Sequence, residues 1–171
     1  MPNSSKMETR CLSSLVKVFP DQELSEPRFE RGSALLNETY SFQVAFRATQ
    51  EISRALKNVQ VQIISGLGDM VSVRVVGLVP SEMPIYGDHD DGILRNTPGL
   101  YPDPLFPIDA ASGITVLPHQ WRSVWITVEP VEPVSDGFYP IRVLFIDQLG
   151  EMLAEENFEL ELMLLIFQSR L

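Results

Sequence analysis

The sequence predicts an all-β chain that folds as an antiparallel β-sandwich, Ig-like or jelly-roll-like, with one long proline-rich loop. Three observations indicate this class. Short runs of alternating apolar and polar residues recur along the chain, glycine and proline turns separate them, and no amphipathic stretch is long enough for a convincing helix. Eight or so strands connected in this way are typical of a sandwich, and a β-barrel is the alternative.

The first part of the chain holds one expected strand. Residues 1–10 are polar and are expected to form a mobile N-terminus. An extended run follows over residues 11–19 and ends at a proline, and a charged loop is expected over residues 21–31. The sandwich itself is therefore expected to occupy residues 11–171 as a single domain, a length that suits one hydrophobic core.

The clearest strand pattern lies between Tyr40 and Arg47. Aromatic residues and valine alternate there with smaller or polar residues, as in a half-buried strand, so the aromatic face is expected in the core. Residues 51–57 could form a helical turn, which is too short to change the fold class. Further strands are expected over residues 59–63, 70–79, 121–128, 138–146 and 158–162, the last continuing into the apolar run 162–167.

The segment from Asp88 to Gln120 interrupts this series of strands. It contains five prolines, at positions 98, 102, 104, 107 and 118. Proline fixes φ and removes a backbone donor, which excludes a helix and a central strand through this segment. Its leucines, tyrosine and phenylalanine supply more apolar surface than a disordered tract has. We therefore expect a long ordered loop that is pinned across one end of the β-structure.

Composition excludes several classes of partner. Thirteen basic and twenty-three acidic residues give a net charge of −10, which repels phosphate backbones and anionic lipids. Nucleic acid and membranes are therefore not expected as partners, whereas neutral ligands such as sugars are compatible with this charge. The apolar run near the end is far shorter than the roughly 20 residues of a spanning helix. With no secretory signal pattern, a cytoplasmic protein is expected.

The chain has one cysteine, Cys11, in a strand-like apolar run. A single cysteine cannot form an intramolecular disulfide, and it offers no metal-ligand spacing. A buried structural thiol is favoured over a nucleophile because no histidine lies near it in sequence to act as its base. The glycines do not form a nucleotide-binding motif, and no cofactor is expected.

Several motifs then occur in a distinctive order. They are SFQVA at Ser41–Ala45, VPS at Val79–Ser81, ILR at Ile93–Arg95 leading into TPGLYPDPL at Thr97–Leu105, and QWRSVW at Gln120–Trp125. In this combination the chain resembles the N-terminal β-sandwich domain of glycoside hydrolase family 123 and its uncharacterised bacterial relatives. The resemblance extends from residue 11 to about residue 165.

The resemblance implies a role beside an enzyme. In that family the sandwich precedes a (β/α) barrel that removes β-linked N-acetylgalactosamine, with the acetamido oxygen of the substrate as nucleophile and an adjacent Asp-Glu pair in the barrel as the catalytic carboxylates. The present chain contains no Asp-Glu dipeptide, and the barrel expected downstream of residue 171 is absent. We therefore expect no catalytic residue and no enzymatic activity in this chain.

Four residues are candidates for carbohydrate binding or domain docking. Trp121 and Trp125 share one face of an expected strand and could stack on a sugar, pack beneath the proline-rich loop, or contact a barrel. Tyr101 and Asp103 lie within the loop and could contribute an edge to a sugar site, although an Asp between two prolines more often hydrogen-bonds within its own turn.

Asp88 and Asp90 are weak candidates for a metal site. With His89 and Asp91 they resemble the start of a calcium loop, which uses closely spaced carboxylates. The twelfth position of such a loop is a bidentate Glu, but here it is Gly99. A solvated acidic turn is therefore favoured over calcium.

Two functions remain open at this point. The first is a non-catalytic accessory domain that supports a barrel acting on N-acetylgalactosamine-containing glycans, with an apolar docking face through which the isolated chain could form a homodimer. The second is a free-standing carbohydrate-binding module. Their partners would be, respectively, a glycosidase barrel domain and a carbohydrate.

Overall fold

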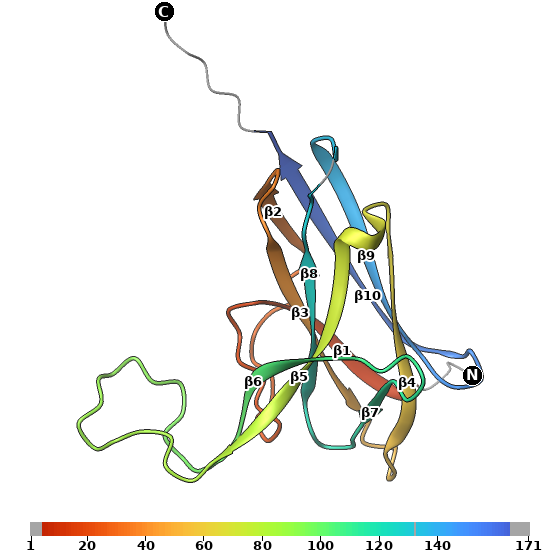
Figure 1. The fold of residues 1–171 in the computed structure, drawn as a ribbon. Coiled ribbons are helices and arrows are strands. Elements are labelled where there is room, and N and C mark those ends of the chain that lie inside the picture. Colours follow the sequence, from red (N-terminus) through yellow and green to blue (C-terminus); the bar gives the residue numbers. More distant parts are fainter. Residues whose placement is uncertain (1–4, 132, 165–171) are drawn as a thin grey trace, which may run out of the picture.

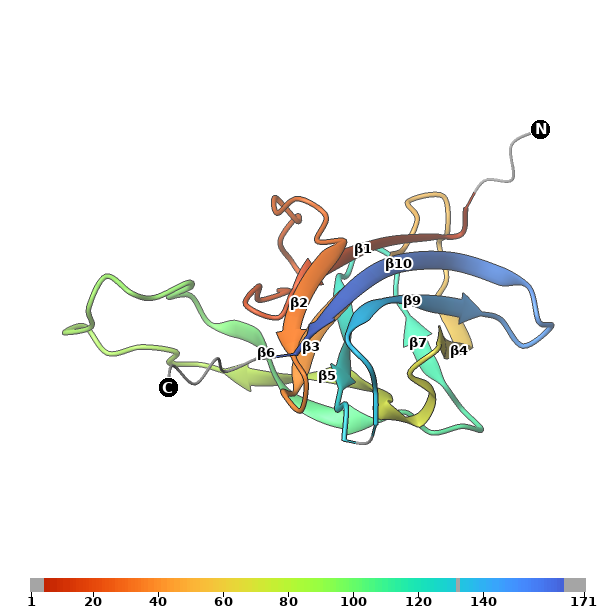
Figure 2. The ribbon, with the colours of Figure 1, turned by 90° about the horizontal axis from the view of Figure 1, so that it is seen from above.

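The structure is a computed structural model that describes residues 5–131 and 133–164. Two five-stranded sheets face each other (Figures 1 and 2), which confirms the predicted β-sandwich. In order across the first sheet, the strands are β1 (Met7–Ser13), β3 (Tyr40–Ala48), β8 (Arg122–Val128), β5 (Val71–Ser81) and β6 (Gly99–Pro107). The second sheet contains β2 (Arg31–Leu35), β10 (Met152–Met163), β9 (Gly137–Ile146), β4 (Leu56–Ser65) and β7 (Ile114–Val116).

Neighbouring strands within the sheets are antiparallel, except that β2 and β10 are parallel. A 3-10 turn at Gly68–Met70 connects β4 to β5. Among the described residues, no helix is long and apolar enough to span a membrane.

The core lies between the two sheets and is built from alternate residues of the central strands. Phe42 of β3 and Phe158 of β10 stack across it with their ring centroids 4.0 Å apart. Aromatic pairs add a specific contact to the hydrophobic effect of burial. Fully or almost fully buried core residues include Phe42, Val44, Phe46, Val124, Ile126, Val128, Ile141, Val143, Phe145, Phe158, Leu160 and Leu162.

The outer face of the first sheet is also partly covered. Segment 14–24 crosses it, and Val18 packs there with Leu12, Ala45 and Trp121 in a second, smaller cluster. As a result Gln43 and Ala45, on the polar side of the predicted half-buried strand, are buried as well. Strand β3 is therefore enclosed on both faces in its middle.

Several boundaries differ from the sequence expectations. β1 begins at Met7, inside the segment expected to be mobile, and β2 begins at Arg31, at the end of the expected charged loop. Residues 51–55 form turns and bends rather than a helical turn, and Leu56 already belongs to β4. β10 ends at Met163, followed by an exposed Leu164, and residues 165–167 of the expected strand lie outside the described residues.

The proline-rich segment was wrongly expected to lack strands, because it contains β6 and β7. Strand β6 is an edge strand that pairs only with β5, so its prolines need not donate to a second neighbour. A bulge between Val76 and Leu78 adjusts the register. The remaining loop, residues 82–98, extends away from both sheets (Figures 1 and 2), and we call it the arm.

Candidate functional site

Trp121 lies immediately before β8 and is 4% exposed. Its ring is covered by the guanidinium of Arg47, which lies 4.4 Å from the ring centroid. The buried indole Nε1 has no hydrogen-bond partner among the described residues, although its proximity to Glu23 helps to lower the pKa of that carboxyl, after the larger effect of Arg47. The ring packs beneath segment 14–24, and only a small part of it borders the polar groove described below, so it offers no open face for stacking.

Trp125 and Asp103 lie on the same cavity, of about 240 Å³, on the outer face of the first sheet. Trp125 is only partly buried and lies directly opposite Gln43 in the register of β3 and β8. The proline-rich segment supplies Pro102, Asp103 and Leu105 to the cavity wall. The structure thus brings two of the four candidates together, while Trp121 lies elsewhere.

Tyr101 faces a neighbouring cavity of about 440 Å³ at the base of the arm. Its ring packs edge-on against Phe19, with centroids 5.5 Å apart, and its hydroxyl donates to the carbonyl oxygen of Thr97 at 2.6 Å. These contacts account for both parts of the side chain, so Tyr101 fastens the arm to the body. Pro102 and Asp103 line both cavities.

Arg95 provides the main polar connection between the arm and the body. Its Nη1 and Nη2 donate to the two carboxylate oxygens of Asp21 at 2.6 and 2.7 Å. The guanidinium also lies over the rings of Phe19 and Tyr101. Hydrogen bonding from Arg95 lowers the pKa of Asp21 below its ordinary value. The bidentate geometry fixes the direction in which the arm leaves the sheet.

Asp88 and Asp90 lie on the exposed tip of the arm. The Asp90 carboxylate accepts a hydrogen bond from the backbone N–H of Gly92 at 3.0 Å, so it closes its own turn. Within residues 5–131 and 133–164 no three His, Cys, Asp or Glu side chains are grouped so that they could hold a metal ion.

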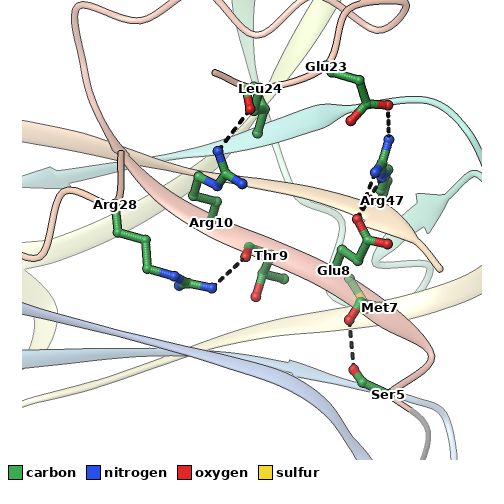
Figure 3. A network of polar contacts seen from close by, with 9 residues as sticks. All are labelled: Ser5, Met7, Glu8, Thr9, Arg10, Glu23, Leu24, Arg28 and Arg47. Atoms are coloured by element: carbon green, nitrogen blue, oxygen red, sulfur yellow. Dashed lines mark hydrogen bonds and ion pairs between the residues drawn. The ribbon is translucent and has the colours of Figure 1, made fainter. Parts of the chain in front are cut away.

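A polar groove that the sequence analysis did not anticipate runs between β1 and β10. It has a volume of about 730 Å³ and is lined mostly by charged residues. Figure 3 shows Arg47 lying between two carboxylates, with Nη2 2.8 Å from Glu8 and Nη1 2.6 Å from Glu23. Arg10 of β1 donates to the backbone carbonyl of Leu24, as Figure 3 shows, and also to that of Glu26.

Glu156 forms the inner wall of this groove, with a side chain that is 5% exposed. Its carboxylate accepts hydrogen bonds from Arg28 at 2.5 and 2.7 Å and from Thr9 at 2.7 Å. A buried carboxylate that is paired in this way avoids much of the desolvation cost of an isolated charge. The sequence does indicate that Glu156 faces inward, because it lies two residues before Phe158 and therefore on the same face of β10.

The groove therefore closes one side of the sandwich rather than offering a reactive group. Arg28 and Arg47 are both engaged with carboxylates, and Glu156 is fully occupied. Nearby Cys11 is completely buried, and burial raises the pKa of its thiol to about 12. A thiol with that pKa is not a nucleophile at neutral pH.

Comparisons with known proteins connect the fold to a solved enzyme. No family model and no curated protein matches the sequence. Among solved structures, a family 123 glycoside hydrolase from Clostridium perfringens, studied for glycolipid glycan hydrolysis, aligns with a TM-score of 0.64 and 12% identity. The match covers 94% of this chain and 28% of that enzyme. At this identity the likeness concerns the fold alone.

Two further structures align less well. AvmM, which catalyses macrocyclization in alchivemycin A biosynthesis, has a TM-score of 0.46 and 8% identity over 98% of this chain and 93% of its own. A β-glucosidase from Listeria innocua, solved with glucose, has a TM-score of 0.38 and 12% identity over 92% of this chain and 16% of its own. These alignments are too weak to support a functional argument.

Proposed function

We propose that this chain is a non-catalytic accessory domain of a glycoside hydrolase-like protein, and that it supports a downstream barrel acting on N-acetylgalactosamine-containing glycans. The observation that carries the proposal is the fold match to the family 123 enzyme, in which nearly all of this chain corresponds to little more than a quarter of a longer glycosidase. The family resemblance of the sequence motifs supports the same role.

The chemistry of the described residues supports the non-catalytic part of the proposal. Substrate-assisted removal of an N-acetylated sugar requires an acid for the leaving oxygen and a second carboxylate that orients the acetamido group. The sequence has no adjacent Asp-Glu pair, and the most enclosed carboxylate of the polar groove, Glu156, is neutralised by Arg28. The cavity at Trp125 is lined by one carboxylate, Asp103.

The arm and β6 provide the surface for docking. Met83, Tyr86 and Leu94 on the arm are each at least 70% exposed, and Phe106 of β6 is 52% exposed. Exposed apolar side chains gathered on one projecting segment are typical of a contact surface. On the accessory-domain hypothesis, the surface of the barrel covers them, and in the isolated chain a second copy can do so.

The test compares the chain with the polypeptide that contains it. The reading frame beyond codon 171 is determined in the source genome, and residues 1–171, the full product and the full product lacking residues 1–171 are purified. We expect hydrolysis of an aryl β-N-acetylgalactosaminide by the full product, no hydrolysis by residues 1–171, and a lower melting temperature for the truncated barrel.

Two results would contradict the proposal. Turnover of the substrate by residues 1–171 alone would show that the chain is catalytic. A barrel needs roughly 250 residues. If the reading frame does not continue for that length, there is no barrel in the same polypeptide for this chain to support.

A further inference from the structure

The cavity at Trp125 has features of a binding site that the accessory role does not require. It lies where segment 14–18 and β6 rise on either side of the outer face of the first sheet, so its floor is β-sheet and its walls are loop and edge strand. Val18 and Val76 in its wall are almost completely buried. A cavity with such a supported floor keeps its shape without a ligand.

Gln43 is the fixed polar group of this cavity. Its side chain is on a residue that is 2% exposed, and its Nε2 donates to the carbonyl oxygens of Ser13 at 3.0 Å and Val16 at 2.6 Å. These two bonds lock the amide plane. Among the described residues no donor meets Oε1. The oxygen is therefore a preoriented acceptor without a protein partner, on a residue that lines the cavity and exposes only a small area to it.

The rim adds one positive and one negative group. Lys17 and Asp103 both line the cavity and are both exposed, and neither forms an ion pair with a described residue. Together they contribute no net charge, so the site does not select an ion. They supply a strong donor and a strong acceptor for hydroxyl or amide groups of a neutral ligand.

Trp125 supplies the apolar surface. It lies opposite Gln43 in the strand register, so the two side chains are cross-strand neighbours in the wall of the cavity. The face of an indole carries partial negative charge, to which the C–H groups of a sugar ring are attracted. A flat apolar surface bordered by donors and acceptors matches a ligand with one apolar face and polar edges.

We propose that this cavity binds a single neutral pyranose ring, which stacks on Trp125 and hydrogen-bonds to Asp103, Gln43 and Lys17. The volume of about 240 Å³ is below the roughly 300–1,000 Å³ of pockets for drug-sized ligands, so it suits one ring rather than a longer glycan. The inference does not rest on the accessory role, because a sandwich can bind sugar whether or not it docks on a barrel.

The chain offers a direct readout because it has two tryptophans, of which Trp125 lines this cavity and Trp121 does not. In a ¹H–¹⁵N spectrum their indole N–H signals are separate probes, assigned by the loss of one signal in the Trp125→Phe variant. Titration with millimolar methyl β-N-acetylgalactosaminide, and with methyl galactoside and glucoside, is expected to move the Trp125 signal saturably. The Trp121 signal is expected to stay in place.

The variant Asp103→Asn tests the rim. Removing one charge-assisted hydrogen bond should weaken binding about tenfold. Asp91→Asn is the matched control, because it makes the same chemical change at an exposed position of the arm outside the cavity. It should leave the affinity unchanged. Both positions are exposed, so both variants are expected to fold, which an unchanged melting temperature confirms.

Three outcomes would overturn the inference. They are no saturable shift of the Trp125 signal with any of the sugars, equal affinity in Asp103→Asn and the parent chain, and a response to a free amino acid such as glutamine but not to sugars. Because the titration uses the isolated chain and needs no barrel, its failure is distinct from a failure of the accessory-domain proposal.

Discussion

The two long sides of the sandwich differ in how well their side chains are covered. On the side where β1 faces β10, polar residues fill the gap, and the charged side chains there are matched: Arg28 with Glu156, and Arg47 with Glu8 and Glu23. On the side formed by β5 and β6, the apolar side chains of Val79, Leu105 and Phe106 are exposed, Phe106 by 52%. One side is complete as a solvent-facing surface, whereas the other leaves apolar area uncovered.

The difference indicates which side of the molecule would gain more free energy from contact with a partner. A paired charge network gains little from a partner, since the partner would have to replace hydrogen bonds already made. An uncovered apolar surface gains from any partner that removes it from water, by about 25 cal/mol for each Å² buried. The β5–β6 side with its arm is therefore where a domain contact stabilises most.

The largest contrast should come from two phenylalanines. Phe158 lies between Phe42, Phe29 and Tyr40 in the core, so Phe158→Ala should destabilise the fold by about 3–5 kcal/mol. Phe106→Ala, on the open side, should cost less than about 1 kcal/mol because its ring already contacts water. Urea unfolding monitored by tryptophan fluorescence measures both. Equal losses would mean that the β5–β6 side is as well packed as the core.

A smaller effect is expected from the charged side. Arg28→Ala leaves the Glu156 carboxylate with Thr9 alone, and because Arg28 is half exposed, water can reach the site and limit the loss to about 2 kcal/mol. Arg31→Ala is the control, since its pair with Glu159 is exposed and 3.6 Å long, and should cost no more than about 0.5 kcal/mol. If the two variants lose the same free energy of unfolding in urea, the Arg28–Glu156 pair does not stabilise this side more than an exposed ion pair does.

The attachment of the arm should depend on pH. The pKa of Asp21 is lowered from its ordinary value of 3.8, first by hydrogen bonding from Arg95. Because the pKa is lowered when the arm is attached, the ion pair stabilises the attached arm fully at pH values above the ordinary pKa. This contribution is lost as the pH falls through the lowered pKa. The NMR chemical shifts of the Arg95 side chain, which lies over the rings of Phe19 and Tyr101, should therefore move toward those of an unstructured chain in that acid range. Asp21→Asn should show such shifts already at neutral pH, and shifts that stay the same in both proteins at every pH would contradict this role.

The smallest effect on stability should come from the exposed apolar residues of the arm. Substituting Met83, Tyr86 and Leu94 by serine should change the free energy of unfolding by within about 0.5 kcal/mol, because these side chains are exposed in the folded chain. The same triple variant should self-associate less at high concentration, as measured by sedimentation equilibrium. A parent chain that stays monomeric without the substitutions would show that the arm is not a docking surface for a second copy.

The strands with strict alternation were predictable, and those that depend on their position in the sheet were not. The pattern from Tyr40 to Arg47 predicted β3 because its core face alternates with smaller residues. β2, with the short sequence RGSAL, has no such pattern and forms because β10 offers it a parallel partner. β6 was missed because three prolines argue against a central strand but are compatible with an edge.

The candidate site was predictable by residue type but not by grouping. Trp121, Trp125, Tyr101 and Asp103 were singled out because aromatic rings and carboxylates are residue types that can contact a sugar, and of these Trp125 and Asp103 line one cavity. Their meeting on one cavity depends on the order β3–β8–β5–β6, a set of long-range pairings that local sequence does not specify. Gln43 was not singled out, because its role follows from two backbone carbonyls, one at the end of β1 and one in the loop after it, which lie 30 and 27 residues away in sequence.

The three prolines of β6 also bear on the behaviour of the chain in a crowded solution. An edge strand normally exposes a row of backbone donors to which other chains can add, which is one route to amyloid-like aggregates. In β6, Pro102, Pro104 and Pro107 remove three of the nine possible donors. Contacts made through this side are therefore restricted largely to side chains, and should stay reversible even where the apolar surface makes them frequent.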